Sequence, residues 1–360
     1  MKNVSIRPLW TIHDSNGASL PPRLIELLVH VEKEGSLLLA SKRMGLSYRH
    51  AWDLVRQGEA QLKLQLLHME RGRGSTLTEL AARIVWADHR IAARLTPLLD
   101  TLASEIGAEL RLALSAAPAA LRMQASHGFA IELLIARLGA EGMQLSVSYA
   151  GSVAAVAALR DGHCDVAGLH VPLGPMQDAT LQYYRSWLDG LKLTQIDIAN
   201  RRQGLIVRAG NPKDIYTLAD LTRKDVRFIN RQPGSGTRLL LEGLLASAEL
   251  SPADITGFEQ GEHTHAAVAA YVASGMADVG FGLETPARRF KLDFVPVARE
   301  RYFLLCRSEI MGTAAVQKML DILRASDFRA VLATLPGYDP AACGDCTDVQ
   351  AAFAHLNQDD

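Results

Sequence analysis

VRFINRQPGSGTRLLLEGLL, residues 226–245, joins an apolar predicted strand to a predicted helix through a loop of glycine, serine and proline. Small residues before a helix let an anion approach the backbone N–H groups, and the partial positive charge of the helix N-terminus favours it. We therefore expect this loop to contact a bound anion. Its candidate residues are Arg231, Ser235, Gly236, Thr237 and Arg238. Arg238 could equally pair with a carboxylate of its own lobe.

Predicted strands and helices alternate on both sides of this stretch, from residue 109 onward. The strands are expected at 110–115, 145–149, 165–170, 203–208, 226–230, 278–282 and 301–306, and the helices at 129–138, 152–160, 237–248, 264–274 and 313–334. Alternation of this kind is typical of parallel α/β sheets, and the interval is long enough for two lobes. Neither a phosphate-loop lysine motif nor a G-x-G-x-x-G motif follows any of these strands, so nucleotide binding has no support.

Two loops of the first lobe have similar chemistry. Ser152 follows Tyr149-Ala-Gly and begins a predicted helix, while Ser126 and His127 lie just before the helix at 129–138. The loop 115–118 is the alternative to Ser126 and His127. Ser and Thr also cap many helices without binding anything, so one such loop alone would be weak evidence.

Three further residues are candidates near the predicted hinge. Thr264 opens a helix and can offer a hydroxyl, although a simple cap explains it as well. Glu300 and Tyr302 lie where the chain returns toward the hinge, and either could gate the cleft.

The first 77 residues have another organisation. Apolar spacing predicts helices at 22–34, 37–44 and 48–62, separated by Gly35 and Gly45, which is a helix-turn-helix pattern. Residues 66–78 fit a β-hairpin wing with a basic tip. In the third helix, Arg49 and Arg56 lie opposite the apolar face, where arginine can reach a guanine edge. A solvated helix face is the alternative.

The residues expected to contact DNA lie on the second and third helices and at the wing. They are Lys42, Arg43, Ser47, Tyr48, Arg49, Trp52, Arg56, Arg71 and Arg73.

A long apolar stripe runs from Leu80 to Ile106 and fits a helix that pairs with a second copy of the chain. Pro97 interrupts the pattern, so we expect a kink or two helices that meet near Thr96. The alternative is that the stripe covers the next domain of the same chain.

Two resemblances follow from these motifs. The run MGLSYRHAWDLV, followed by LTELAARIV, resembles the DNA-binding domain of ModE-type, molybdate-responsive regulators over residues 17–106, although the wing is less glycine-rich and Ala81 replaces a glycine. NRQPGSGTR followed by THAAVAAYVASGMADVG resembles the molybdate-binding-like periplasmic-binding-protein domain found fused to bacterial regulators, over residues 109–338.

The resemblances imply a fold and a function for each segment. Residues 1–77 would form a mainly α winged helix-turn-helix, 78–108 a linker and dimerisation helix, 109–338 an α/β two-lobed domain of the type II periplasmic-binding-protein-like class, and 339–360 a tail. The chain would be a one-component transcriptional regulator that binds double-stranded DNA as a homodimer. Molybdate or tungstate is the first expectation for its effector, and a carboxylate, sulfate, phosphate or related metabolite is the alternative.

Composition excludes several other classes of protein. The 360 residues are 48% hydrophobic and 21% charged with net charge -1, which is ordinary for a globular protein and not for a disordered chain. No signal peptide and no membrane span is expected, so we expect a cytoplasmic protein.

Cys343 and Cys346 have metal or redox spacing but lack a second pair. We expect no metal, no cofactor and no catalytic residues, and an α/β enzyme is the remote alternative.

Overall fold

The structure is a computed structural model that describes residues 4–15, 17–70, 74–113, 121–188 and 190–349. The chain divides into two compact units, one of residues 7–95 and one of residues 96–360 together with the first six. Among the described residues, no helix is both long enough and apolar enough to cross a membrane.

The first unit contains three helices and a hairpin, as predicted. They are α1 (Leu24–Glu34), α2 (Leu37–Arg43), α3 (Tyr48–Leu62), β1 (Leu67–Glu70) and β2 (Gly74–Leu77). Ser36 caps α2 and Ser47 caps α3, where its hydroxyl accepts a hydrogen bond from the His50 backbone N–H at 3.2 Å. Strands β1 and β2 pair antiparallel, which confirms the predicted hairpin.

Helices α1 and α3 pack their apolar faces into one core. The buried positions follow the helical spacing read from the sequence: Leu24, Leu27, Leu28 and Val31 on α1, and Ala51, Leu54, Val55 and Gly58 on α3. Gly58 is required by close packing, because a Cβ atom there would lie 2.3 Å from a methyl carbon of Leu24. This core fixes which face of α3 remains in solvent.

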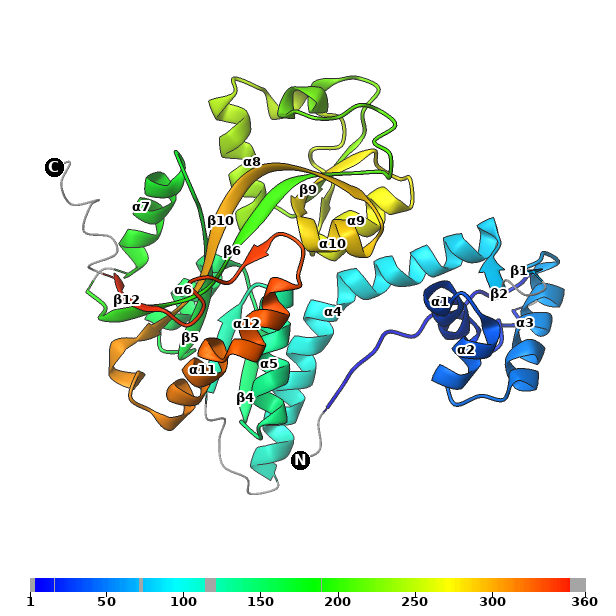
Figure 1. Ribbon diagram of the computed structural model, residues 1–360, viewed down its shortest axis with the longest axis horizontal. Coiled ribbons are helices and arrows are strands. Elements are labelled where there is room, and N and C mark those ends of the chain that lie inside the picture. The colour runs from blue at the N-terminus through cyan, green and yellow to red at the C-terminus, as the bar shows by residue number, and fades with distance from the viewer. Residues whose placement is uncertain (1–3, 16, 71–73, 114–120, 189, 350–360) are drawn as a thin grey trace. The chain divides into compact units, whose positions relative to one another are not determined.

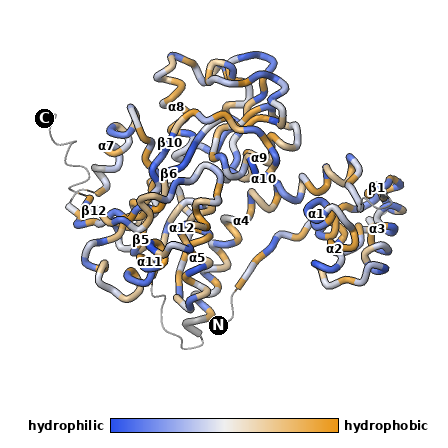
Figure 2. The backbone as a smooth tube through the Cα atoms, in the orientation of Figure 1, coloured by the Kyte–Doolittle hydropathy of each residue, from blue (hydrophilic) through white to orange (hydrophobic). Residues whose placement is uncertain are grey.

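Helix α4 runs as one helix from Glu79 to Ala113, and the boundary between the two units falls between Leu95 and Thr96. Of the two outcomes expected near Thr96, two separate helices are therefore wrong, and the kink stays a prediction. The strand expected at 110–115 is also wrong for residues 110–113, which belong to α4. The apolar spacing of Leu102, Ile106 and Leu110 continues the helical pattern up to this point. Residues 114 and 115 lie outside the described residues. Figure 2 shows apolar and polar residues alternating along α4.

The second unit is built on one mixed sheet of ten strands. In spatial order they are β4 (Leu145–Tyr149), β3 (Leu121–Ala125), β5 (Val166–Pro172), β10 (Asp293–Arg307), β6 (Leu193–Val207), β9 (Val279–Leu283), β7 (Phe228–Arg231) and β8 (Gly261–Glu262), while β11 (Tyr338–Asp339) and β12 (Cys346–Asp348) also pair with β6. Strands pair parallel within β3–β4–β5 and within β7–β8–β9, as expected.

Strands β6 and β10 cross from one lobe to the other and form the hinge (Figure 1). They pair antiparallel along their whole length, from Asp293 opposite Val207 to Arg307 opposite Leu193. The sequence pattern predicted only their more apolar halves, at 203–208 and 301–306. The other halves of β6 and β10 contain many polar residues, so they do not form the apolar runs that predict a strand.

Helices cover the sheet in each lobe. The first lobe has α5 (Phe129–Ala140), α6 (Ser152–Arg160), α7 (Gln177–Leu188), α11 (Ala314–Arg324) and α12 (Ser326–Ala333), and the second has α8 (Gly236–Ser247), α9 (His265–Ala273) and α10 (Glu284–Arg289). Short 3₁₀ helices lie at Leu218–Thr222, Pro252–Asp254 and Ser308–Ile310. Each lobe has its own apolar cores, so the two lobes form walls on either side of the hinge strands.

Candidate functional site

The loops predicted to bind a ligand come from both lobes and meet at the hinge. A methyl group on Gly236, at the start of α8, would lie 3.6 Å from a ring carbon of His170 at the end of β5. The loop before α6 lies equally close to the other lobe, since a methyl group on Gly151 would lie 3.8 Å from the Gly234 carbonyl oxygen. Gly234 has a φ of 77°, a left-handed conformation that favours glycine and allows the tight turn before α8.

His170 lies between Ser126 of the first lobe and Arg201 of the hinge. Its Nε2 atom is 2.6 Å from the Ser126 hydroxyl, and its Nδ1 atom is 2.7 Å from an Arg201 nitrogen. Burial, and then the positive charges of Arg201 and Arg231, hold the pKa of His170 well below its ordinary value, so the ring is neutral.

The hydrogen bonds of His170 determine what Ser126 can do. A guanidinium can only donate, so Nδ1 of the neutral ring accepts from Arg201 and Nε2–H donates to the Ser126 oxygen. The Ser126 hydroxyl therefore has its own proton to donate to a third group, and an anion is a suitable acceptor.

Arg201 is buried on β6 and forms an ion pair with Glu300 of β10. Burial alone would lower the pKa of Arg201, but Glu300 raises it above its ordinary value. The guanidinium carbon also lies 4.6 Å from the centre of the Tyr302 ring, which stacks on His170 at 4.7 Å. The Arg201 Nε atom and the Tyr302 hydroxyl are buried without a hydrogen-bond partner among the described residues. Such orphaned groups are typical of a binding site.

Arg231 lies at the end of β7 and is a second buried arginine at this place. It donates to the backbone carbonyl oxygens of Glu262 and His263 at 3.2 and 3.0 Å. Burial, then the charge of Arg201, lowers the pKa of Arg231 to about 10, and Glu300 partly opposes this. It stays charged at neutral pH. Among the described residues, no carboxylate lies within ion-pair distance of it.

The α8 side of the site carries Thr237. Its hydroxyl oxygen accepts a hydrogen bond of 3.2 Å from the Gln203 amide on β6, so the hydroxyl proton is directed elsewhere. Ser235 caps α8 by accepting from the Arg238 backbone N–H. We call the whole group the polar centre; it consists of Ser126, His170, Arg201, Arg231, Thr237, Glu300 and Tyr302.

Ser152 and His127 lie beside the polar centre. The Ser152 hydroxyl oxygen is buried at the start of α6, and no hydrogen-bond partner lies within reach of it among the described residues. Burial raises the pKa of the nearby Tyr184 hydroxyl. The His127 ring packs on Tyr149 at 4.8 Å and lies 3.3 Å from a carboxylate oxygen of Glu132.

Two other candidates have the partners that their alternative interpretations anticipated. Arg238 forms ion pairs with Glu242 at 2.8 Å and Glu259 at 3.0 Å. Thr264 caps α9 by accepting from the Ala267 backbone N–H at 2.9 Å. Their role in ligand binding stays a prediction.

Sequence reasoning missed four residues as site residues, namely His170, Arg201, Gln203 and His265. Arg201 and Gln203 are two apart in one strand, so their side chains point to the same face. The predicted strand began at Gln203, so Arg201 lay two residues before it. His265 is buried at the start of α9, where its Nδ1 atom accepts from the Leu283 backbone N–H at 3.3 Å.

The predicted DNA-binding residues lie mostly on the solvent side of the first unit. Those that are exposed are Lys42, Arg43, Ser47, Tyr48, Arg49 and Arg56, and Trp52 is half-buried. The Arg56 guanidinium lies 5.9 Å from the centre of the Trp52 ring. Arg43 has an ion pair with Glu34 at 3.4 Å. Arg71 and Arg73 lie outside the described residues.

Family models match both parts of the chain. Residues 136–324, more than half of the chain, match the PBP superfamily domain, and residues 22–82 match the bacterial regulatory helix-turn-helix protein of the lysR family. The helix-turn-helix family that matches is the lysR family, and the match does not show the ModE-type relation expected from the sequence.

The chain also resembles individual proteins. It is 33% identical over 54% of its length to the uncharacterized protein YvgK of Bacillus subtilis (strain 168), of which it spans 63%. It is 33% identical over 29% of its length to an uncharacterized protein in the 5′ region of a 2Fe-2S ferredoxin gene of Clostridium pasteurianum, of which it spans 95%. A solved structure, the tungstate ABC transporter from Geobacter sulfurreducens, is 17% identical with a TM-score of 0.43, covering 59% of this chain and 97% of that one.

Proposed function

This chain belongs to the PBP superfamily domain family and carries a lysR-family helix-turn-helix, and we propose that it is a transcriptional regulator whose effector is a small anion. The anion would bind at the polar centre between the two lobes and change how the helix-turn-helix unit binds DNA. The proposal includes no catalytic step, and it places the chain in the cytoplasm, where DNA is accessible.

The observation that carries the proposal is the charge of the polar centre. Arg201 is neutralised by Glu300, whereas Arg231 is buried and charged without a paired carboxylate among the described residues. These three groups leave one positive charge in excess in a region of low dielectric, where an unpaired charge is costly. A bound anion would neutralise it. The hydroxyl protons of Ser126 and Thr237, together with the N-terminus of α8, would complete its hydrogen bonds.

A tetrahedral dianion suits donors that converge from both lobes, because its four oxygens can accept from all of them at once. We therefore propose a tetrahedral dianionic group at the polar centre, of which molybdate and tungstate are the simplest examples and the first candidates from the ModE-type resemblance of the sequence. A carboxylate, sulfate or phosphate is the alternative, since hydroxyl and N–H donors bind each of these groups.

We propose that α3 enters the major groove of double-stranded DNA. Its apolar face is buried against α1, so Arg49 and Arg56 remain available for base edges and phosphates. Substituting either by alanine should cost about 1–3 kcal/mol of specific binding.

We propose that a second copy of the chain covers part of α4. Large apolar side chains remain exposed along it at helical spacing, namely Leu95, Leu98, Leu102, Ile106 and Leu110. A Leu98→Asp variant should be monomeric by light scattering where the wild-type chain is dimeric, and a wild-type monomer at micromolar concentration would contradict the dimer.

Titration calorimetry of the full chain tests the anion site. The panel is molybdate, tungstate, sulfate, phosphate, formate and acetate. We expect a tetrahedral dianion to bind in the micromolar range, and Arg231→Met to weaken it by about 10- to 100-fold, because a charged donor is lost.

Arg227→Met is the matched control, since its half-exposed guanidinium is paired with Asp278 and does not belong to the polar centre. It should bind within about threefold of the wild type. If no anion binds below millimolar concentration, or if both variants lose affinity equally, the anion site is wrong. Tighter binding of acetate than of molybdate would select the alternative effector.

A further inference from the structure

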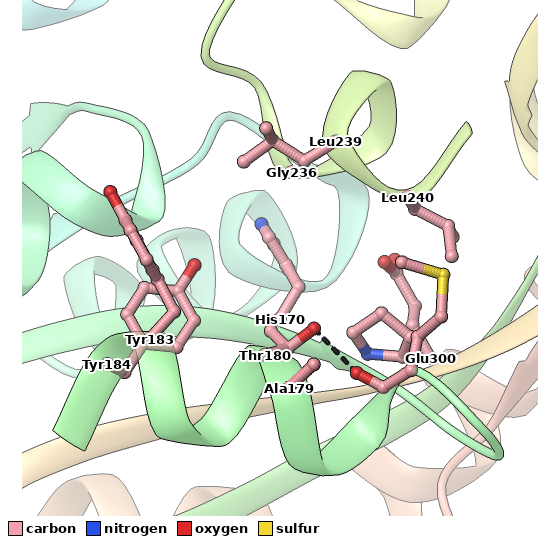
Figure 3. Close-up of a pocket in the computed structure, with 11 residues that line it drawn as sticks. His170, Ala179, Thr180, Tyr183, Tyr184, Gly236, Leu239, Leu240 and Glu300 are labelled. Atoms are coloured by element: carbon pink, nitrogen blue, oxygen red, sulfur yellow. Dashed lines mark hydrogen bonds between the residues drawn. The ribbon is translucent and has the colours of Figure 1, made fainter. Parts of the chain in front are cut away.

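An apolar pocket opens beside the polar centre, between α7 of the first lobe and α8 of the second (Figure 3). Its volume is about 280 Å³. The residues that line it are His170, Pro172, Met176, Ala179, Thr180, Tyr183, Tyr184, Gly236, Leu239, Leu240 and Glu300. The pocket therefore shares His170 and Glu300 with the polar centre, so the two spaces adjoin.

The walls of the pocket offer little to a polar ligand. Leu240 and Met176 are apolar, and the Thr180 hydroxyl already donates to the Met176 carbonyl oxygen at 2.8 Å. Tyr184 is buried, so it presents its ring rather than an exposed hydroxyl. Glu300 is neutralised by its ion pair with Arg201, so the carboxylate in the wall does not repel an anion as an isolated charge would.

Apolar side chains at the pocket are left in solvent. Leu239 is 45% exposed and Tyr183 is 54% exposed, although both are large. They come from opposite lobes, and Figure 3 shows α7 and α8 on opposite sides of the space. An apolar group bound here would remove water from both walls at once and would favour the closed arrangement of the lobes.

We propose that the effector is an organic anion, with its charged group at the polar centre and an aromatic ring or short aliphatic chain in the apolar pocket. This inference rests on the proposed function for the charged group alone. A bare oxyanion such as molybdate would occupy the polar centre and leave the pocket empty. The volume falls near the lower end of small-molecule sites, which begin at about 300 Å³.

Matched pairs of ligands on the full chain test the proposal. Phenylphosphonate and methylphosphonate carry the same charged group and differ in the apolar body, and benzyl alcohol carries the ring without the charge. We expect phenylphosphonate to bind about 10- to 50-fold more tightly than methylphosphonate in calorimetry, because burying a phenyl ring removes apolar surface from water. Ligand-observed NMR should detect weak binding of benzyl alcohol.

A bulky substitution in the pocket wall provides the structural test. Ala179 is exposed on α7 and lines the pocket, so Ala179→Trp fills it from the surface without disturbing a core. The advantage of phenylphosphonate should then fall below about twofold, and benzyl alcohol should no longer bind. Gln182→Trp, on an exposed position of α7 that does not line the pocket, is the control and should retain both.

The outcomes separate this proposal from the proposed function. If methylphosphonate binds and the phenyl ring adds nothing, the apolar pocket is not a ligand site and the anion site stands. If benzyl alcohol binds, Ala179→Trp abolishes it and no anion binds, the pocket stands and the anion site fails. Equal affinities of the two phosphonates, or no binding of any probe at 5 mM, overturn the proposal.

Discussion

The ligand loops of the two lobes are attached to different parts of the molecule. In the first lobe, the Tyr149 and Val147 backbone N–H groups donate to the hydroxyls of Thr101 and Ser104 on α4, at 3.1 and 2.9 Å. Asp100 of α4 also lies 3.8 Å from a nitrogen of the His127 ring. In the second lobe, Thr237 is held by Gln203 of the hinge strand β6.

This difference assigns separate tasks to the lobes. Strand β4 is an edge strand, and α4 satisfies N–H groups that a neighbouring strand would otherwise satisfy. Because α4 begins within residues 7–95 and continues into the first lobe, we propose that ligand binding at the first-lobe loops acts on the helix-turn-helix unit through α4. The second-lobe loop acts on the hinge and should mainly set affinity.

The largest effect should come from Arg201, which contacts both the first lobe and the hinge. Arg201→Met leaves Glu300 buried without its partner, which should cost about 3–5 kcal/mol of unfolding free energy and abolish anion binding. Denaturant unfolding measures it. Arg122→Met breaks a half-exposed pair with Asp165 and should cost below about 1 kcal/mol. Equal losses in the two variants would show that the hinge pair has no special role.

Removing one hydroxyl from each lobe compares how much the two ligand loops contribute to anion affinity. Ser126→Ala and Thr237→Val should each weaken the tightest-binding anion of the panel by about 10- to 100-fold, with unchanged circular dichroism, because each loses a donor to a charged acceptor. Titration calorimetry measures the anion affinity of both variants. Normal binding by either variant would remove that lobe's loop from the site.

Lowering the pH should destabilise the second unit through one histidine of each lobe. Burial, and then the charges of nearby arginines, hold the pKa of His170 and of His265 well below the ordinary value. The unfolded chain binds protons near pH 6.5 and the folded chain does not, so stability is complete above that pH and is lost as the pH falls. Each histidine should contribute up to about 1.4 kcal/mol per pH unit between pH 6 and 5.

His170→Gln and His265→Gln should each remove one part of that slope in denaturant unfolding followed across pH. A slope unchanged in both variants would mean that other groups carry the acid sensitivity.

The smallest effect on stability, and the most specific one on signalling, should follow from Thr101→Val. It removes one hydrogen bond between α4 and the first-lobe loop, which costs about 1 kcal/mol. Anion affinity should stay within twofold, while the effect of the anion on DNA binding should largely disappear. Thr222→Val, which removes a hydroxyl bond to the Ala219 carbonyl oxygen in the second lobe, is the control. An unchanged DNA response in Thr101→Val would show that α4 is not driven through this contact.

The parts of the fold that depend on local spacing could be predicted, and the parts built by distant segments could not. The three helices of the first unit follow from apolar periodicity and from caps such as Ser36 and Ser47. The loop at 231–238 could be predicted as an anion-binding loop because its glycine-rich turn and the following helix are neighbours in the sequence. Arg201 belongs to the site because β6 pairs with β10, which places Arg201 opposite Glu300. The two residues are about 100 positions apart in the sequence, so no local pattern could predict that they meet.

Helix α7 was also missed. Residues 177–188 were assigned to no element from the sequence, although Leu181, Tyr184 and Leu188 fall at helical spacing. The structure buries these three side chains against α6 and β5. Without α7, one wall of the apolar pocket was absent from the sequence-based account.

The most direct test of the central claim is the affinity of the full chain for DNA, measured with and without a saturating anion. The DNA is a fragment that the chain selects from a random pool, and the anions are molybdate, tungstate, methylphosphonate and phenylphosphonate. We predict that at least one of them changes the DNA affinity by fivefold or more, a typical coupling of about 1 kcal/mol, and that Arg231→Met removes the change. DNA affinity that stays the same with every anion, or that changes equally in Arg231→Met, would contradict the account.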